Sequence, residues 1–225
     1  MKARYPAGNT QQKWLMPIDK RSAYHHAGQA AAIYLSNKQK QLPAVHFQIV
    51  IEHKDSVSSA CHARDAKPQR VVSVEGGRLI QSLPLLKAEA LDGLSNSAQK
   101  EYRLAFEADI VNILAGPLAE AKYCALRENQ VFNPNLVYLG ALKFYGGRAG
   151  LSVINEYLEG VYSQREVRDH KLVELFLAAY SFVNNQLNLQ AITALAVHIL
   201  DQHHKHVIDC NDVIALLEAS HLALA

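Results

Sequence analysis

The sequence predicts an α+β fold in which helices predominate, with one small β-hairpin or sheet after the first helix. Apolar residues recur at helical spacing over most of the 225 residues. Only two short stretches, close together in the chain, are instead rich in β-branched and aromatic residues. Because 49% of the residues are apolar, the chain can bury one sizeable core.

The first part of the chain contains the first helix and both predicted strands. The helix is expected over residues 20–35, with Asp19 as its N-cap. The β-rich stretches predict strands at residues 44–53 and 70–74, and the glycine pair that ends at Gly77 marks the turn after the second strand. These strands are the only β signal that the sequence offers.

The rest of the chain has the pattern of helices. A long helix over residues 97–127 is expected to kink or break at Pro117, because proline removes one helical hydrogen bond and clashes with the preceding turn. Further helices are expected to begin in "NPNLVYLGALKF", along the apolar stripes that start at Leu172 and Leu189, and after an N-cap at Asp209.

The length and composition of the chain favour one domain preceded by a short arm. We expect residues 1–18 to form an N-terminal arm and residues 19–225 to form a single domain. The start of the chain lacks the apolar stretch of a secretory signal, and no run of apolar residues is long enough to span a membrane. Three widely spaced cysteines, Cys61, Cys124 and Cys210, indicate a reducing, cytoplasmic setting. The net charge of +2, with acids and bases interspersed, requires neither a nucleic-acid nor a membrane partner.

The motif that points to chemistry lies in the first helix, in the stretch "YHHAGQAAAIYL". His25 and Gln29 are four residues apart, so they share one helical face, and His26 follows His25 directly. A metallopeptidase H-E-x-x-H motif uses this spacing: two imidazoles bind zinc and the glutamate acts as general base. The alternative is an ordinary helix whose Gly28 face packs closely on a neighbour, with two half-buried histidines.

The same stretch resembles the "H-E-A-G-H-A" helix of the FtsH-type ATP-dependent zinc metallopeptidases. In that family a short sheet follows the motif helix, and a long helix with an "AGRAAEE"-like segment comes next. The stretch "EADIVNILAGPLAEAKY", residues 107–123, is similar to that segment, although Pro117 replaces the family's arginine. The resemblance covers residues 19–220 and implies an FtsH-peptidase-like helical bundle.

The resemblance also implies where a zinc site would lie and how it has changed. His25 matches the first zinc ligand, His26 replaces the catalytic glutamate, and Gln29 replaces the second ligand. The family's third ligand, an aspartate after a glycine-rich stretch, falls at Gly150 or Leu151. Outside these positions, Glu120 matches a glutamate of the family that can hydrogen-bond a ligand residue.

These replacements lead to a preferred hypothesis and two alternatives. The preferred hypothesis is a pseudopeptidase that needs no cofactor and binds a protein or peptide, held as an extended segment against the sheet edge. The first alternative is a divergent zinc metallopeptidase that uses His25, His26 and an unassigned carboxylate. The second is a structural subunit that assembles with copies of itself.

The histidines of "HILDQHHKHVID", at positions 198, 203, 204 and 206, are expected to lie at a solvated helix end and loop.

Overall fold

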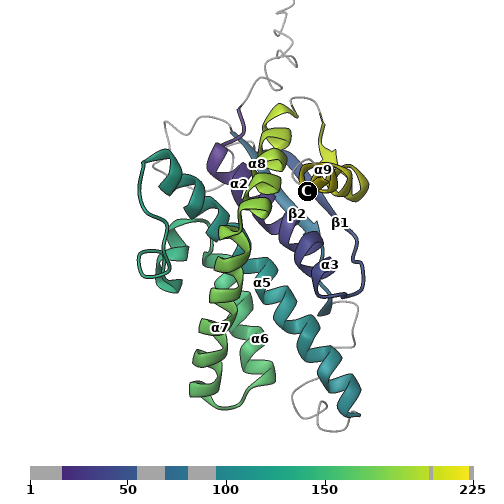
Figure 1. Cartoon of the computed structure of the whole chain (residues 1–225), viewed down its shortest axis with the longest axis vertical. Coiled ribbons are helices and arrows are strands. Elements are labelled where there is room, and N and C mark those ends of the chain that lie inside the picture. The colour runs from purple at the N-terminus through teal and green to yellow at the C-terminus, as the bar shows by residue number, and fades with distance from the viewer. Residues whose placement is uncertain (1–16, 55–68, 81–94, 203–204, 223–225) are drawn as a thin grey trace, which may run out of the picture.

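The computed structural model describes residues 17–54, 69–80, 95–202 and 205–222, and over these it is mostly helical with one small antiparallel sheet (Figure 1). The mostly α character and the position of the sheet after the first helix are therefore confirmed. Most of residues 1–18, the predicted arm, lie outside the described residues, as do Cys61, His203 and His204. Ile18, which we expected in the arm, is buried and forms a β-bridge with Arg70.

The motif lies on α2 (Lys20–Ala31), which begins at the expected N-cap. The Asp19 carboxylate accepts a hydrogen bond from the backbone N–H of Arg21. The helix extends beyond its predicted end, through a π-helical turn, η1 (Ala32–Ser36), and into α3 (Asn37–Gln39). Its buried face consists mainly of alanines, whose small side chains let neighbouring helices approach closely.

The long helix α5 (Asn96–Arg127) packs along α2 and is the main partner of that helix (Figure 1). The predicted break is wrong, because Pro117 lies inside one continuous helix. Proline costs this helix one backbone hydrogen bond. Nearly every residue of α5 from Ala105 to Ala121 is buried, however, and this packing holds the segment in helical form.

The sheet has three strands in the order β2-β1-β3, where the sequence predicted two. Strands β1 (Phe47–Lys54) and β2 (Gln69–Gly76) form an antiparallel pair in register from Phe47 opposite Gly76 to Lys54 opposite Gln69. The third strand, β3 (Val207–Ile208), pairs with Ile49 and Val50 of β1. It was missed because two residues show no periodicity, and only the long-range pairing makes them a strand.

In the described part of the chain after α5, a 3₁₀ helix and four α-helices follow. The stretch "NPNLVYLGALKF" begins with turns capped by the Asn133 side chain, and the helix expected there is the 3₁₀ helix η3 (Leu139–Phe144). The predicted stripes face the core, and Asp209 caps the last helix by accepting from two backbone N–H groups. The helices are α6 (Arg148–Val161), α7 (Arg165–Asn184), α8 (Gln186–Asp201) and α9 (Cys210–Leu222).

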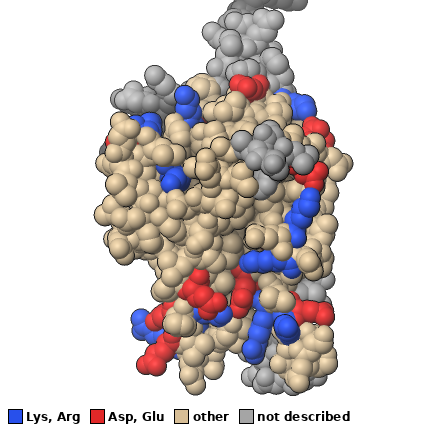
Figure 2. Space-filling view, viewed as in Figure 1, with Lys and Arg blue, Asp and Glu red and all other residues tan. Residues whose placement is uncertain are grey.

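The surface carries charges of both signs, and the two described cysteines form no disulfide. Acidic and basic side chains intermingle on the lower part of the face in Figure 2, and most of its upper part is uncharged. Cys124 and Cys210 are buried free thiols. No helix within the described residues is long and apolar enough to cross a membrane.

Candidate functional site

A pocket of about 270 Å³ lies between α2, α5 and the start of α6, and it gathers most of the predicted site residues. His25, His26 and Gln29 line it from α2, and Gly150 lines it from the first turn of α6. Leu151, the other position considered for the third ligand, does not line it. The remaining lining residues are Arg78, Ile113, Pro117, Gly146, Gly147, Ala149 and Val153.

The imidazole of His25 occupies a narrow slot between two glycines. A Cβ atom at Gly116 would lie 2.9 Å from His25 Nε2, and a Cβ atom at Gly146 would lie 3.0 Å from His25 Cε1. Gly146 also has a φ of +71°, which residues with side chains rarely adopt. Side chains at these two positions would displace the ring, so the glycines fix where His25 sits.

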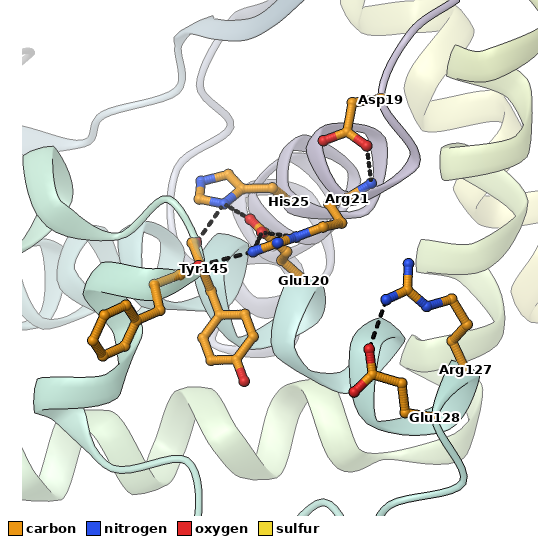
Figure 3. Close-up of polar contacts among 8 residues, drawn as sticks. Asp19, Arg21, His25, Glu120, Arg127, Glu128 and Tyr145 are labelled. Atoms are coloured by element: carbon orange, nitrogen blue, oxygen red, sulfur yellow. Dashed lines mark hydrogen bonds and ion pairs between the residues drawn. The ribbon is translucent and has the colours of Figure 1, made fainter.

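Hydrogen bonds fix the orientation of the same ring (Figure 3). His25 Nδ1 lies 3.1 Å from Glu120 Oε2 and 3.1 Å from the carbonyl oxygen of Tyr145. Both neighbours are acceptors, so we assign the proton to Nδ1. In the neutral ring, Nε2 then carries the free lone pair. Glu120, which the resemblance implies can hydrogen-bond a ligand residue, contacts His25, and this is the arrangement by which a carboxylate orients a metal-binding or catalytic histidine.

The Glu120 carboxylate is itself held by Arg21. Arg21 Nε donates to Glu120 Oε1 at 2.8 Å, and Arg21 Nη2 lies 2.7 Å from the same oxygen (Figure 3). Burial acts to raise the pKa of Glu120, but the hydrogen bonds from His25 and Arg21 outweigh it and lower the pKa below its ordinary value. Glu120 is therefore an ionised carboxylate whose two oxygens already have partners.

His26 is poorly suited to the role of the catalytic glutamate that the family resemblance implies at its position. Burial, helped by the neighbouring His25, lowers the pKa of His26 to about 3. Its Nδ1 is buried and has no hydrogen-bond partner among the described residues. A general base works best with a pKa near the working pH, so a neutral imidazole with this pKa is a weak base.

Two glycines of the predicted site sit at close contacts. A Cβ atom at Gly28 would lie 2.3 Å from Ala119 Cβ and 2.8 Å from the carbonyl oxygen of Ala115, so the predicted close helix contact at Gly28 is present. A Cβ atom at Gly150 would lie 2.7 Å from Ile113 Cγ2. An aspartate at position 150 would therefore face the pocket only if Ile113 yielded.

Sequence reasoning missed Arg78, which brings a positive charge to the pocket. It follows the Gly76-Gly77 turn at the end of β2, and this turn was the only local signal of its position. Glu156 of α6 and Asp169 of α7, two carboxylates later in the chain that could serve as the unassigned ligand, do not line the pocket. Within the described ranges, no group of three or more histidine, cysteine, aspartate or glutamate side chains is placed to hold a metal ion.

Comparisons with known proteins add nothing to this picture: no protein-family model, curated protein or solved structure matches the chain. The relation to the FtsH-type peptidases therefore rests on the motifs in the sequence and stays a prediction.

Proposed function

We propose that this chain is a peptidase-like domain that binds a protein or peptide segment and does not hydrolyse it with zinc. The observation that supports this most strongly is the content of the pocket. It brings together His25, His26, Gln29 and Gly150, the four positions that the family resemblance assigns to zinc chemistry, and three of the four carry a different residue. In this proposal the chain keeps the position of the family's zinc site and has lost its chemistry.

The side chains around the pocket do not fit a hydrolytic zinc ion. Such an ion needs three protein ligands and an open position for water. His25 is a suitable ligand, but Gln29 offers only a neutral amide oxygen and Gly150 offers no side chain. No carboxylate of the described part of the chain lines the pocket, and the guanidinium of Arg78 opposes a divalent cation there.

The position of the sheet supports peptide binding. β2 is at the edge of the sheet, and within the described ranges its outer edge pairs only through the bridge between Ile18 and Arg70. An unpaired strand edge can accept an extended peptide by backbone hydrogen bonds. Because β2 ends at Gly76, two residues before Arg78, a peptide laid along this edge would lead toward the pocket.

One observation favours the alternative of a divergent zinc metallopeptidase. The bond from His25 Nδ1 to Glu120 leaves Nε2 as the nitrogen that a metal would use. In that alternative His25 and His26 would both bind the metal, with a carboxylate from another part of the chain or from a partner.

Proteolysis assays distinguish the proposed inactive peptide-binding domain from an active zinc metallopeptidase. The protein, with its affinity tag removed, should leave unfolded casein intact in the presence of added zinc. The matched control is His25→Ala, which removes the one retained ligand. Cleavage by the unmodified protein that is lost both with a chelator and in His25→Ala would establish the metallopeptidase and defeat our proposal.

Rebuilding the family's constellation tests whether the pocket is a changed zinc site. The changes are His26→Glu, Gln29→His and Gly150→Asp, combined with Ile113→Ala to make room for the new aspartate. This variant should bind zinc, whereas Ile113→Ala alone should not. A folded variant that fails to bind zinc would count against the assignment of these positions to the family's ligands.

A further inference from the structure

The guanidinium of Arg78 gives the lining of the candidate pocket a positive charge. Its polar lining consists of the guanidinium of Arg78, the amide of Gln29 and the imidazoles of His25 and His26. Among the residues that the structure describes, neither an aspartate nor a glutamate lines the pocket. An anionic ligand is therefore the complementary one.

Arg78 is not neutralised by a hydrogen-bonded carboxylate among the described residues. Its one hydrogen bond runs from Nη1 to the hydroxyl of Tyr157 at 3.2 Å. The buried carboxylate of Asp109 lies nearby, but its two oxygens accept the backbone N–H groups of Leu79 and Ile80, each at 2.9 Å. The charge of Arg78 remains available to a ligand.

The backbone that carries Arg78 is fixed on both sides. Gly77, just before it, is buried, with a φ of +76°, and a Cβ there would lie 2.6 Å from the side chain of Ile33. Just after it, Asp109 holds the two following N–H groups. Arg78 is thus presented by a rigid segment, which lowers the entropic cost of binding.

The part of the pocket lining that α6 contributes also suits an anion. Ala149 and Gly150 line it from the first turn of α6, a helix of 14 residues whose start has no side-chain cap and no acidic residue in the first turn. The positive end of the helix dipole therefore faces the same space. The helix N-terminus adds to the guanidinium of Arg78 and the amide of Gln29, which already line the pocket.

We infer that Arg78 and Gln29 form a carboxylate-binding site in this pocket. The guanidinium fork matches a carboxylate with two parallel hydrogen bonds, and the Gln29 amide can donate a further one. A pocket of about 270 Å³ holds a single side chain or chain end. Together with the proposed peptide-binding function, on which this step rests, the inference is that the bound peptide inserts an acidic side chain or its C-terminal carboxylate.

The small probe N-acetylglutamate α-amide tests the carboxylate site without a peptide. Titrated into the full chain and followed by NMR, it should shift the backbone amide signals of Ala149 and Gly150, and N-acetylglutamine α-amide should not. The shift should disappear in Arg78→Met and weaken in Arg78→Lys, which keeps the charge but loses the fork. It should persist in Arg103→Met, which removes an exposed arginine outside the pocket. Equal shifts with both probes, or shifts that survive both Arg78 changes in folded protein, would overturn the inference.

Labelled peptides of one apolar sequence test the peptide step by fluorescence anisotropy. One carries an internal glutamate and an amidated end, a second carries glutamine and a free C-terminus, and a third carries glutamine and an amidated end. One of the first two should bind about tenfold more tightly than the third, and Arg78→Met should remove the preference. Peptide binding without such a preference defeats the carboxylate inference and leaves the peptide-binding function. Binding of the small probe without binding of any peptide defeats the peptide-binding function and leaves the carboxylate site.

Discussion

The contact at Gly28 gives the most exact stability prediction. Any side chain at this position would meet α5, because the Cβ of an alanine would lie 2.3 Å from Ala119 Cβ. Carbon atoms in contact normally sit about 3.5–4.0 Å apart, so the two helices would have to separate by more than about 1 Å. Overpacking of this kind costs about 1–3 kcal/mol or more, against about 1 kcal/mol gained by removing a mid-helix glycine.

The clash involves Ala119 Cβ and a backbone oxygen, which cannot rotate away, so the cost lies at the upper end of this range. Gly28→Ala should therefore lower the free energy of unfolding by about 2 kcal/mol, and Gly28→Leu should lower it further. For a chain of this size, 1 kcal/mol corresponds to about 2–4 °C in Tm, so thermal and urea denaturation will resolve the change. The matched control is Gly160→Ala on α6, where a Cβ would meet nothing within 4 Å. This control should be neutral or stabilising by up to about 1 kcal/mol. If Gly28→Ala is as stable as the control, the close packing of α2 on α5 is refuted.

Three further predictions concern buried polar groups. Because the pKa of His26 is about 3 in the folded protein and near its ordinary value of 6.5 in the unfolded chain, the unfolded chain binds an extra proton between these two pH values. The free energy of unfolding should therefore fall as the pH drops through this window, by at most about 1.4 kcal/mol per pH unit. Urea denaturation at several pH values should show a weaker pH dependence of stability in His26→Leu but not in the control His170→Leu, which changes an exposed histidine. Asp109→Asn replaces one acceptor of a buried backbone N–H by a donor and should cost about 1–3 kcal/mol in urea denaturation, and an equally stable variant would contradict the two bonds. Arg70 is only 2% exposed and donates hydrogen bonds to the carbonyl oxygens of Gln202 and Lys205, just before β3. Arg70→Met should therefore speed amide hydrogen exchange in β3, and unchanged exchange would show that these bonds do not hold the strand.

The parts of the fold that the sequence predicts are those with a local cause. Asp19 and Asp209 cap their helices as expected, because a cap depends on one side chain and the next few N–H groups. The continuity of α5 through Pro117 and the two-residue strand β3 depend on long-range packing and pairing, which local patterns do not contain. Single-sequence patterns weigh such tertiary effects poorly.

In the candidate site, too, the features with a local cause are predicted from the sequence and those that depend on long-range contacts are not. The spacing of His25 and Gln29 predicts that they share a face, and the resemblance places Glu120 beside His25; the structure has both features. The carbonyl of Tyr145, which also holds His25, is a backbone group and has no signature in the sequence. Arg78 was missed because only the folding of the hairpin onto α2 brings it to the pocket.

The metal content of the protein tests the central claim most directly. The protein, with its tag removed, is dialysed against excess zinc and then against buffer without zinc, and the bound metal is measured by mass spectrometry. Our account predicts far less than one zinc per chain, no different from the His25→Ala control, because the imidazoles of His25 and His26 have only an amide, a glycine and an arginine beside them and lack the third ligand that zinc needs. One zinc per chain that is lost in His25→Ala would contradict the account and make the metallopeptidase the better reading.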